Sequence, residues 1–149
     1  MPYKNILRDK TRSERRVTWG NVEKDCYQAE AEFSENTHFE LATIVLTGEK
    51  RQVRIRFPFS YCYQITDRNL ASVIWDIPVN PSKGAEYPLY RIENSFLIEQ
   101  IVHNAGGVLY KQELEHYWVL TNNLLIDIIL YEGQGGDIQI EEVVKNEVG

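Results

Sequence analysis

The feature that most constrains this fold is a stretch of alternating side chains from Val53 to Ile65. The apolar members all have odd numbers: Val53, Ile55, Phe57, Phe59, Tyr61, Tyr63 and Ile65. Side chains repeat every two residues along a strand but every 3.6 along a helix, so the pattern predicts a strand with its odd-numbered side on a core. Pro58 has no N–H to donate to a sheet. We therefore expect a bend, bulge or edge there, with different neighbours on the two sides.

Two further segments extend this prediction. Tyr27–Phe33 alternates with odd-numbered residues apolar, and Phe39–Leu46 is apolar on both faces apart from Glu40 and Thr43. If Leu41 and Ile55 face the same side, paired residue numbers in these two strands must sum to an even number. The acidic and basic side chains of the three segments then share one face of the sheet: Glu30, Glu32, Glu40, Arg54 and Arg56.

The remaining strands are bounded by turn residues. Asn122-Asn123 favours a two-residue hairpin turn, because Asn tolerates positive φ, and this pairing places Trp118 opposite Asp127. Pro88 indicates an edge position for its strand. The predicted strands are Ser72–Ile77, Tyr87–Ile92, His116–Thr121, Leu124–Tyr131 and Asp137–Val144.

One helix is predicted at about residues 95–105. Asn94 or Ser95 can cap its start, Gly106-Gly107 can end it, and its apolar residues form one stripe. His103 lies away from that stripe and is predicted to be solvated. We therefore expect an α+β fold: a mainly antiparallel sheet of about six to eight strands with this principal helix packed on one face.

Length and charge suggest the domain organisation. A chain of 149 residues with 43% hydrophobic content fits one globular domain. Residues 1–16 hold six basic and two acidic side chains, a net charge of +4, which leaves −10 for the rest of a chain whose net charge is −6. We expect a basic N-terminal arm, residues 1–18, before a single acidic α+β domain, residues 19–149.

The composition argues against membrane insertion or secretion. The longest apolar stretch, Leu124–Tyr131, is interrupted by Asp127 and is far shorter than the roughly 20 residues of a membrane span. The N-terminus shows no apolar signal-peptide region, so a cytoplasmic location is expected. Cys26 and Cys62 are expected to be reduced thiols, although a disulfide between neighbouring strands stays open.

No motif for catalysis, cofactor binding or metal binding stands out. The histidines His38, His103 and His116 form no metal-ligand motif, and neither cysteine has a flanking nucleophile motif. The glycine-rich segment 133–136 lacks the lysine of a phosphate-binding loop. The sequence therefore predicts no catalytic residue, no cofactor and no metal.

The function that fits these features is a small acidic protein-binding module for a basic protein. Its most concrete form is an immunity or inhibitor protein that neutralises a basic toxin, such as a nuclease, by covering the active site. The predicted partner contacts are Glu30, Glu32, Glu40 and Asp76. Arg54 and Arg56 are predicted to modify the electrostatic potential around them.

Two alternatives remain open from the sequence. One is an assembly or adaptor protein whose basic arm, residues 1–16, contacts a subunit or nucleic acid. The other is an enzyme or small-molecule binder with an unrecognised site between helix and sheet. Nucleic-acid binding by the acidic body is not expected, and the sequence leaves a homo-oligomer open.

Overall fold

The long alternating stretch is divided at Pro58 into two strands of different sheets. β4 (Arg51–Phe57) ends directly before Pro58, and β5 (Cys62–Asp67) lies in the other sheet. The predicted bend at Pro58, with different neighbours on its two sides, is confirmed.

The computed structural model describes residues 14–33, 42–58, 62–74, 77, 84–108 and 110–144. Nine strands form two antiparallel sheets in this part of the chain. The five-stranded sheet has the order β1 (Arg15–Thr18), β6 (Leu89–Glu93), β7 (Leu114–Leu120), β8 (Leu124–Tyr131) and β5. The four-stranded sheet has the order β2 (Gln28–Phe33), β3 (Ala42–Thr47), β4 and β9 (Gln139–Val144).

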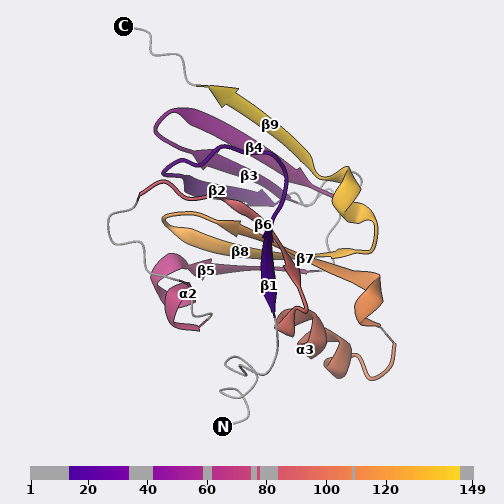
Figure 1. The fold of residues 1–149 in the computed structure, drawn as a ribbon. Coiled ribbons are helices and arrows are strands. Elements are labelled where there is room, and N and C mark those ends of the chain that lie inside the picture. Colours follow the sequence, from indigo (N-terminus) through magenta and orange to yellow (C-terminus); the bar gives the residue numbers. More distant parts are fainter. Residues whose placement is uncertain are drawn as a thin grey trace, which may run out of the picture.

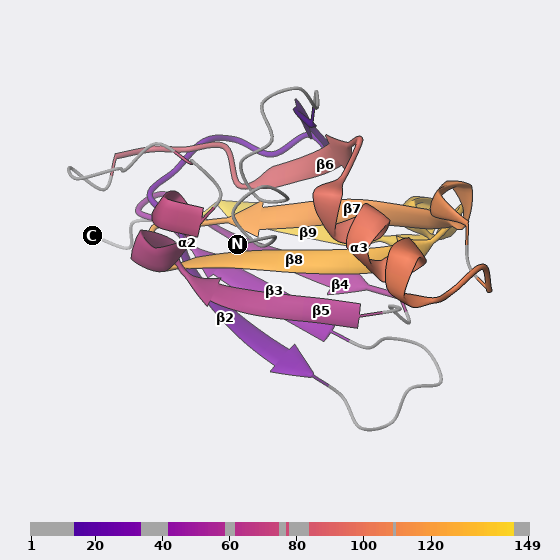
Figure 2. The same ribbon diagram turned by 90° about the horizontal axis from the view of Figure 1, so that it is seen from below.

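The main core lies between the two sheets. Both contribute to it, the four-stranded sheet mostly through β3 and β4 and the five-stranded sheet mostly through β7 and β8. Helices α2 (Arg68–Ile74) and α3 (Phe96–Asn104) cover the outer face of the five-stranded sheet, whereas no described helix lies on the outer face of the four-stranded sheet (Figures 1 and 2). The α+β class, the antiparallel pairing and the single principal helix are confirmed. Two short 3-10 turns, η1 (Lys111–Glu113) and η2 (Gln134–Asp137), flank the β7–β8 hairpin.

The principal helix begins and ends as predicted. The Ser95 side chain accepts a hydrogen bond from the N–H of Ile98, which is the N-cap interaction. Gly106 and Gly107 follow the helix with φ of 63° and 94°, a conformation that glycine adopts without a steric penalty. His103 is exposed, as expected. No helix in the described residues is both long and apolar enough to cross a membrane.

The β7–β8 hairpin has the predicted register, with Trp118 opposite Asp127. Its turn does not use positive φ, because Asn94 is the one described non-glycine residue with that conformation. Asn123 acts through its side chain instead. Its Oδ1 accepts from the N–H of Ala29 and its Nδ2 donates to the carbonyl of Ala29, which fastens this turn to β2 of the opposite sheet.

Two predicted strands are corrected. Part of the predicted strand Ser72–Ile77 lies in α2, because Asp67 accepts the N–H groups of Asn69 and Leu70 and starts a helix there. The strand after Pro88 is not at an edge, since β6 pairs with β1 on one side and β7 on the other. Pro88 lies just before β6, so its missing N–H does not remove a hydrogen bond between β6 and its neighbouring strands.

The register of β3 and β4 also differs from the prediction. Ile44 pairs with Ile55, so paired numbers sum to an odd number, and the even-numbered residues of β3 are the buried ones. The segment Phe39–Leu46 has apolar residues of both parities, so its pattern fits either register, and the prediction chose the wrong one. Leu41, on which the prediction was based, lies outside the described residues.

The inward-facing residues of β5 are less buried than predicted. Tyr63 and Ile65 pair with Ile128 and Ile126, which belong to the core between the sheets, but each is 42% exposed. β5 is the last strand of its sheet, and the core ends there.

Candidate functional site

Four of the six predicted partner residues share one surface. Glu30 and Glu32 on β2 and Arg54 and Arg56 on β4 all lie on the outer face of the four-stranded sheet, opposite the buried positions of those strands. We call this surface the open face. The predicted contacts Glu40 and Asp76 lie outside the described residues, as does His38.

The charges on the open face are arranged by strand. Glu30 is opposite Val45 of β3, Val45 is opposite Arg54, and Arg54 is opposite Glu141 of β9. β3 therefore separates the glutamates from the arginines by two strand spacings, about 10 Å. Arg54 and Glu141 form an ion pair at 3.9 Å, but no ion pair involves Glu30 or Glu32 in the described part of the chain.

A buried polar network lies on the outer face of the five-stranded sheet. Ser95 Oγ is 2.6 Å from His116 Nδ1, and His116 Nε2 is 2.7 Å from Asp127 Oδ1. The three residues are 4%, 2% and 1% exposed. They come from the N-terminus of α3, from β7 and from β8. We call them the Ser95–His116–Asp127 network.

Apolar side chains lie on both sides of this network. One cluster lies under α3 and includes Ile98, Leu114 and Ile129, and the other lies near α2 and includes Ala71 and Leu125. The network therefore occupies a polar strip between two hydrophobic clusters. Two buried polar atoms here have no hydrogen-bond partner among the described residues: Oδ2 of Asp127, which belongs to the network, and Nε1 of the neighbouring Trp118.

The chain just before and within β1 lies against the network. Glu14 Oε2 accepts a hydrogen bond of 2.9 Å from the N–H of Phe96, in the first turn of α3. Burial raises the pKa of Glu14, although this hydrogen bond and the nearby His116 and Arg16 lower it in part. The guanidinium of Arg16 lies 4.7 Å from the centre of the Trp118 ring. Part of the predicted basic arm thus contacts the domain.

The sequence analysis missed this network because it compared His116 only with neighbours in sequence. The hairpin register, however, already placed Asp127 opposite Trp118, so His116 and Asp127 are diagonal neighbours on one face. No pattern in the sequence indicates the contact between Ser95 and His116, because this contact depends on how α3 packs on the sheet.

A pocket of about 350 Å³ lies next to Ser95. Its apolar lining comes from Ile92, Ile98 and Leu114. Four carboxylates and two basic side chains also line it: Glu93, Glu99, Glu115, Glu132, Arg91 and Lys111. The pocket is therefore acidic on balance and has an apolar part.

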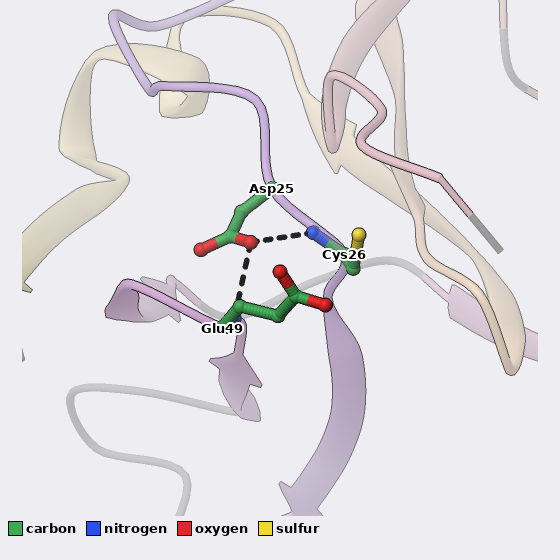
Figure 3. Close-up of side chains that lie close together, drawn as sticks. All are labelled: Asp25, Cys26 and Glu49. Carbon is green, nitrogen blue, oxygen red and sulfur yellow. Dashed lines mark hydrogen bonds between the residues drawn. The ribbon is translucent and has the colours of Figure 1, made fainter.

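A second cluster joins Asp25, Cys26 and Glu49, whose ligand atoms lie within 4.8 Å of one another. Figure 3 shows the Asp25 carboxylate turned toward the backbone nitrogens of Cys26 and Glu49, at 2.7 and 3.0 Å. Asp25 also accepts the N–H of Lys50, and a side chain at Gly48 would collide with its carboxylate. Asp25 therefore organises the β3–β4 turn, and the cluster needs no metal to explain it.

The two cysteines are unpaired thiols. Burial raises the pKa of Cys62, and burial together with the carboxylates of Glu49 and Asp25 raises the pKa of Cys26. Because the thiolate is the reactive form, neither environment activates a nucleophile.

Asp25→Asn is expected to destabilise the fold at pH 7 by about 1–3 kcal/mol, because the amide cannot accept all of these hydrogen bonds. Burial raises the pKa of Asp25, but the backbone N–H groups of Lys50, Cys26 and Glu49 outweigh it and leave this pKa below its usual value. The stabilisation is thus present above about pH 4 and is lost as pH falls through the folded-state pKa. Urea unfolding of the wild type and Asp25→Asn at pH 7 and at pH 3 measures the difference in stability at each pH.

The exposed Asp137→Asn is the control, with an expected change within about 0.5 kcal/mol at either pH. A difference between wild type and Asp25→Asn that stays constant from pH 7 to pH 3 would contradict this account of the turn.

Comparison of the chain with protein-family models, with curated proteins and with solved structures finds no match.

Proposed function

We propose that this protein is a binding module for a basic protein, which it contacts through the open face. The observation that carries the proposal is the state of Glu30 and Glu32. Both are exposed on β2, and neither is neutralised by an ion pair among the described residues. The strand holds their backbones in a fixed geometry, so a partner meets two carboxylates that are already positioned.

The shape and charge of the molecule support this choice of surface. Both described helices lie on the other sheet, so no described helix covers the open face (Figures 1 and 2). The net charge of −6 attracts a basic partner over a longer range and speeds association.

The most concrete form of this function is inhibition of a basic toxin such as a nuclease. The active site of a nuclease must attract the phosphates of its substrate, so it is lined with positive charge. Carboxylates on a rigid surface can occupy that region in place of phosphates. Arg54 and Arg56, two strands away, would then repel basic side chains and fix the orientation of the partner.

The double variant Glu30→Lys with Glu32→Lys is expected to weaken binding of the partner by about 100-fold or more, with most of the loss in the association rate. The partner is first isolated by a tagged pull-down from the source organism's lysate with nuclease present. Its affinity for the wild type and each variant is then measured by surface plasmon resonance at two salt concentrations.

The matched control is Glu23→Lys with Glu132→Lys, which makes the same change in net charge at two exposed sites off the open face. If both double variants lose affinity equally, net charge alone explains binding and the open face is the wrong surface. If no stoichiometric basic protein is recovered, the proposed function itself fails.

A further inference from the structure

We propose that Ser95 is the nucleophile of an acyl-transfer site, in which His116 is the general base and Asp127 holds the imidazole. The substrate class is a small ester whose acyl part is neutral or positively charged. This activity goes beyond the proposed function and does not depend on the open face.

The hydrogen bonds of the network place the protons as this chemistry requires. An ionised carboxylate only accepts hydrogen bonds, so Asp127 assigns the ring proton of His116 to Nε2. The lone pair of Nδ1 then accepts from the hydroxyl of Ser95 at 2.6 Å. A nucleophile within hydrogen-bond reach of a base that a third group orients is the arrangement that activates a serine.

The backbone around Ser95 adds two features. Ser95 lies in a strand–turn–helix segment between β6 and α3, and Asn94 before it has φ of 55°, the one left-handed non-glycine residue in the described chain. Ser95 also lies at the positive end of α3. The N–H of Phe96 beside it can donate to the negative oxygen that develops on a substrate carbonyl.

The reaction has two balanced steps. His116 Nδ1 takes the proton of Ser95 while Oγ attacks the carbonyl carbon. The bond to the alcohol then breaks, and the alcohol leaves with the proton from His116. In the second step water attacks the acyl-serine, His116 takes the water proton, and the carboxylic acid leaves as that proton returns to Ser95 Oγ. Asp127 carries no proton in either step.

The pocket beside Ser95 sets the substrate class. Its volume of about 350 Å³ suits a small molecule, and Ile92, Ile98 and Leu114 give it an apolar wall. Its carboxylates outnumber its basic groups, so an anionic acyl group is disfavoured.

Glu14 blocks the backbone donor beside Ser95. Its carboxylate occupies the N–H of Phe96, where the substrate oxygen would be bound, and Ser95 is 4% exposed. Glu14 must move away before an ester can react. Glu14→Ala is therefore expected to raise the reaction rate of Ser95 by about tenfold or more, the equivalent of one charged hydrogen bond.

The test is labelling of the full chain with an uncharged fluorophosphonate, followed by intact mass measurement and peptide mapping. We expect one label on Ser95, faster labelling of Glu14→Ala, and none at this position in Ser95→Ala. Asp127→Asn, which keeps the shape of the side chain, is expected to slow labelling by about 100-fold or more. Ser72→Ala, which removes a hydroxyl on α2, is expected to label as the wild type does.

Near-ultraviolet circular dichroism of each variant separates loss of chemistry from loss of fold. The proposal is overturned if folded wild type and folded Glu14→Ala both stay unlabelled at Ser95 while a serine esterase in the same tube reacts fully. It is also overturned if Asp127→Asn is folded and labels at the wild-type rate, because Ser95 would then be reactive without the network. In the first case Ser95 is only the cap of α3.

Discussion

His116→Ala is expected to lower the free energy of unfolding by about 3–5 kcal/mol, because it leaves the buried Asp127 carboxylate without its hydrogen-bond partner. Asp127 is 1% exposed, and its Oδ1 is hydrogen-bonded to His116. Its Oδ2 has no hydrogen-bond partner among the described residues, so His116 is the one described partner of this carboxylate. Without the imidazole, neither oxygen of this buried carboxylate has a hydrogen-bond donor among the described residues. Urea unfolding at pH 7, followed by circular dichroism, measures the loss.

His103→Ala is the matched control, because it removes the same side chain from an exposed position on α3. We expect a change within about 0.5 kcal/mol. A second check replaces both buried groups, His116→Leu with Asp127→Leu. Since a buried polar pair can often be replaced by apolar residues at little cost, this double variant should recover most of the stability. If His116→Ala costs no more than His103→Ala, the network does not exist in solution as described.

Arg68→Ala is expected to lower the free energy of unfolding by about 3 kcal/mol or more, the second large effect. Arg68 is 5% exposed and binds both carboxylate oxygens of Glu86, at 2.8 and 2.9 Å. It also donates to the carbonyl of Thr121 at 2.8 Å. One side chain therefore joins the start of α2, the chain before β6 and the β7–β8 turn, and its removal leaves a buried carbonyl and a partly buried carboxylate without this donor.

Arg15→Ala provides the comparison for Arg68. Arg15 forms an ion pair with Glu93 at 3.4 Å, but these side chains are 67% and 47% exposed, so water replaces the lost contact. The expected cost is about 0–1 kcal/mol. Equal losses for the two arginine variants in thermal or urea unfolding would show that burial does not set the strength of these pairs.

The two sheets divide the molecule into an accessible side and a covered side. The four-stranded sheet presents the open face, where the predicted partner residues Glu30 and Glu32 lie. The five-stranded sheet carries α2, α3 and the Ser95–His116–Asp127 network beneath them. Variants on the two sides can therefore be tested independently, because the core between the sheets separates them.

Local features of the sequence determined several of the elements, although β1 and helix α2 were not among them. The alternation from Val53, the break at Pro58 and the Ser95 cap depend on residues close together in the chain, and so does the register of Trp118 with Asp127. The exposed charges of β2 and β4 were equally readable, because a strand turns alternate side chains to opposite faces.

Tertiary structure alone decided which sheet each strand joins and what each element covers. β1 pairs with β6 and so removes the edge predicted near Pro88, and the end of the core leaves Ile65 exposed. Ser95 and His116 meet only because α3 packs across β7. Periodicity shows which side of an element is buried, but the choice of partner depends on contacts between distant residues, whose free energies do not appear in any local pattern.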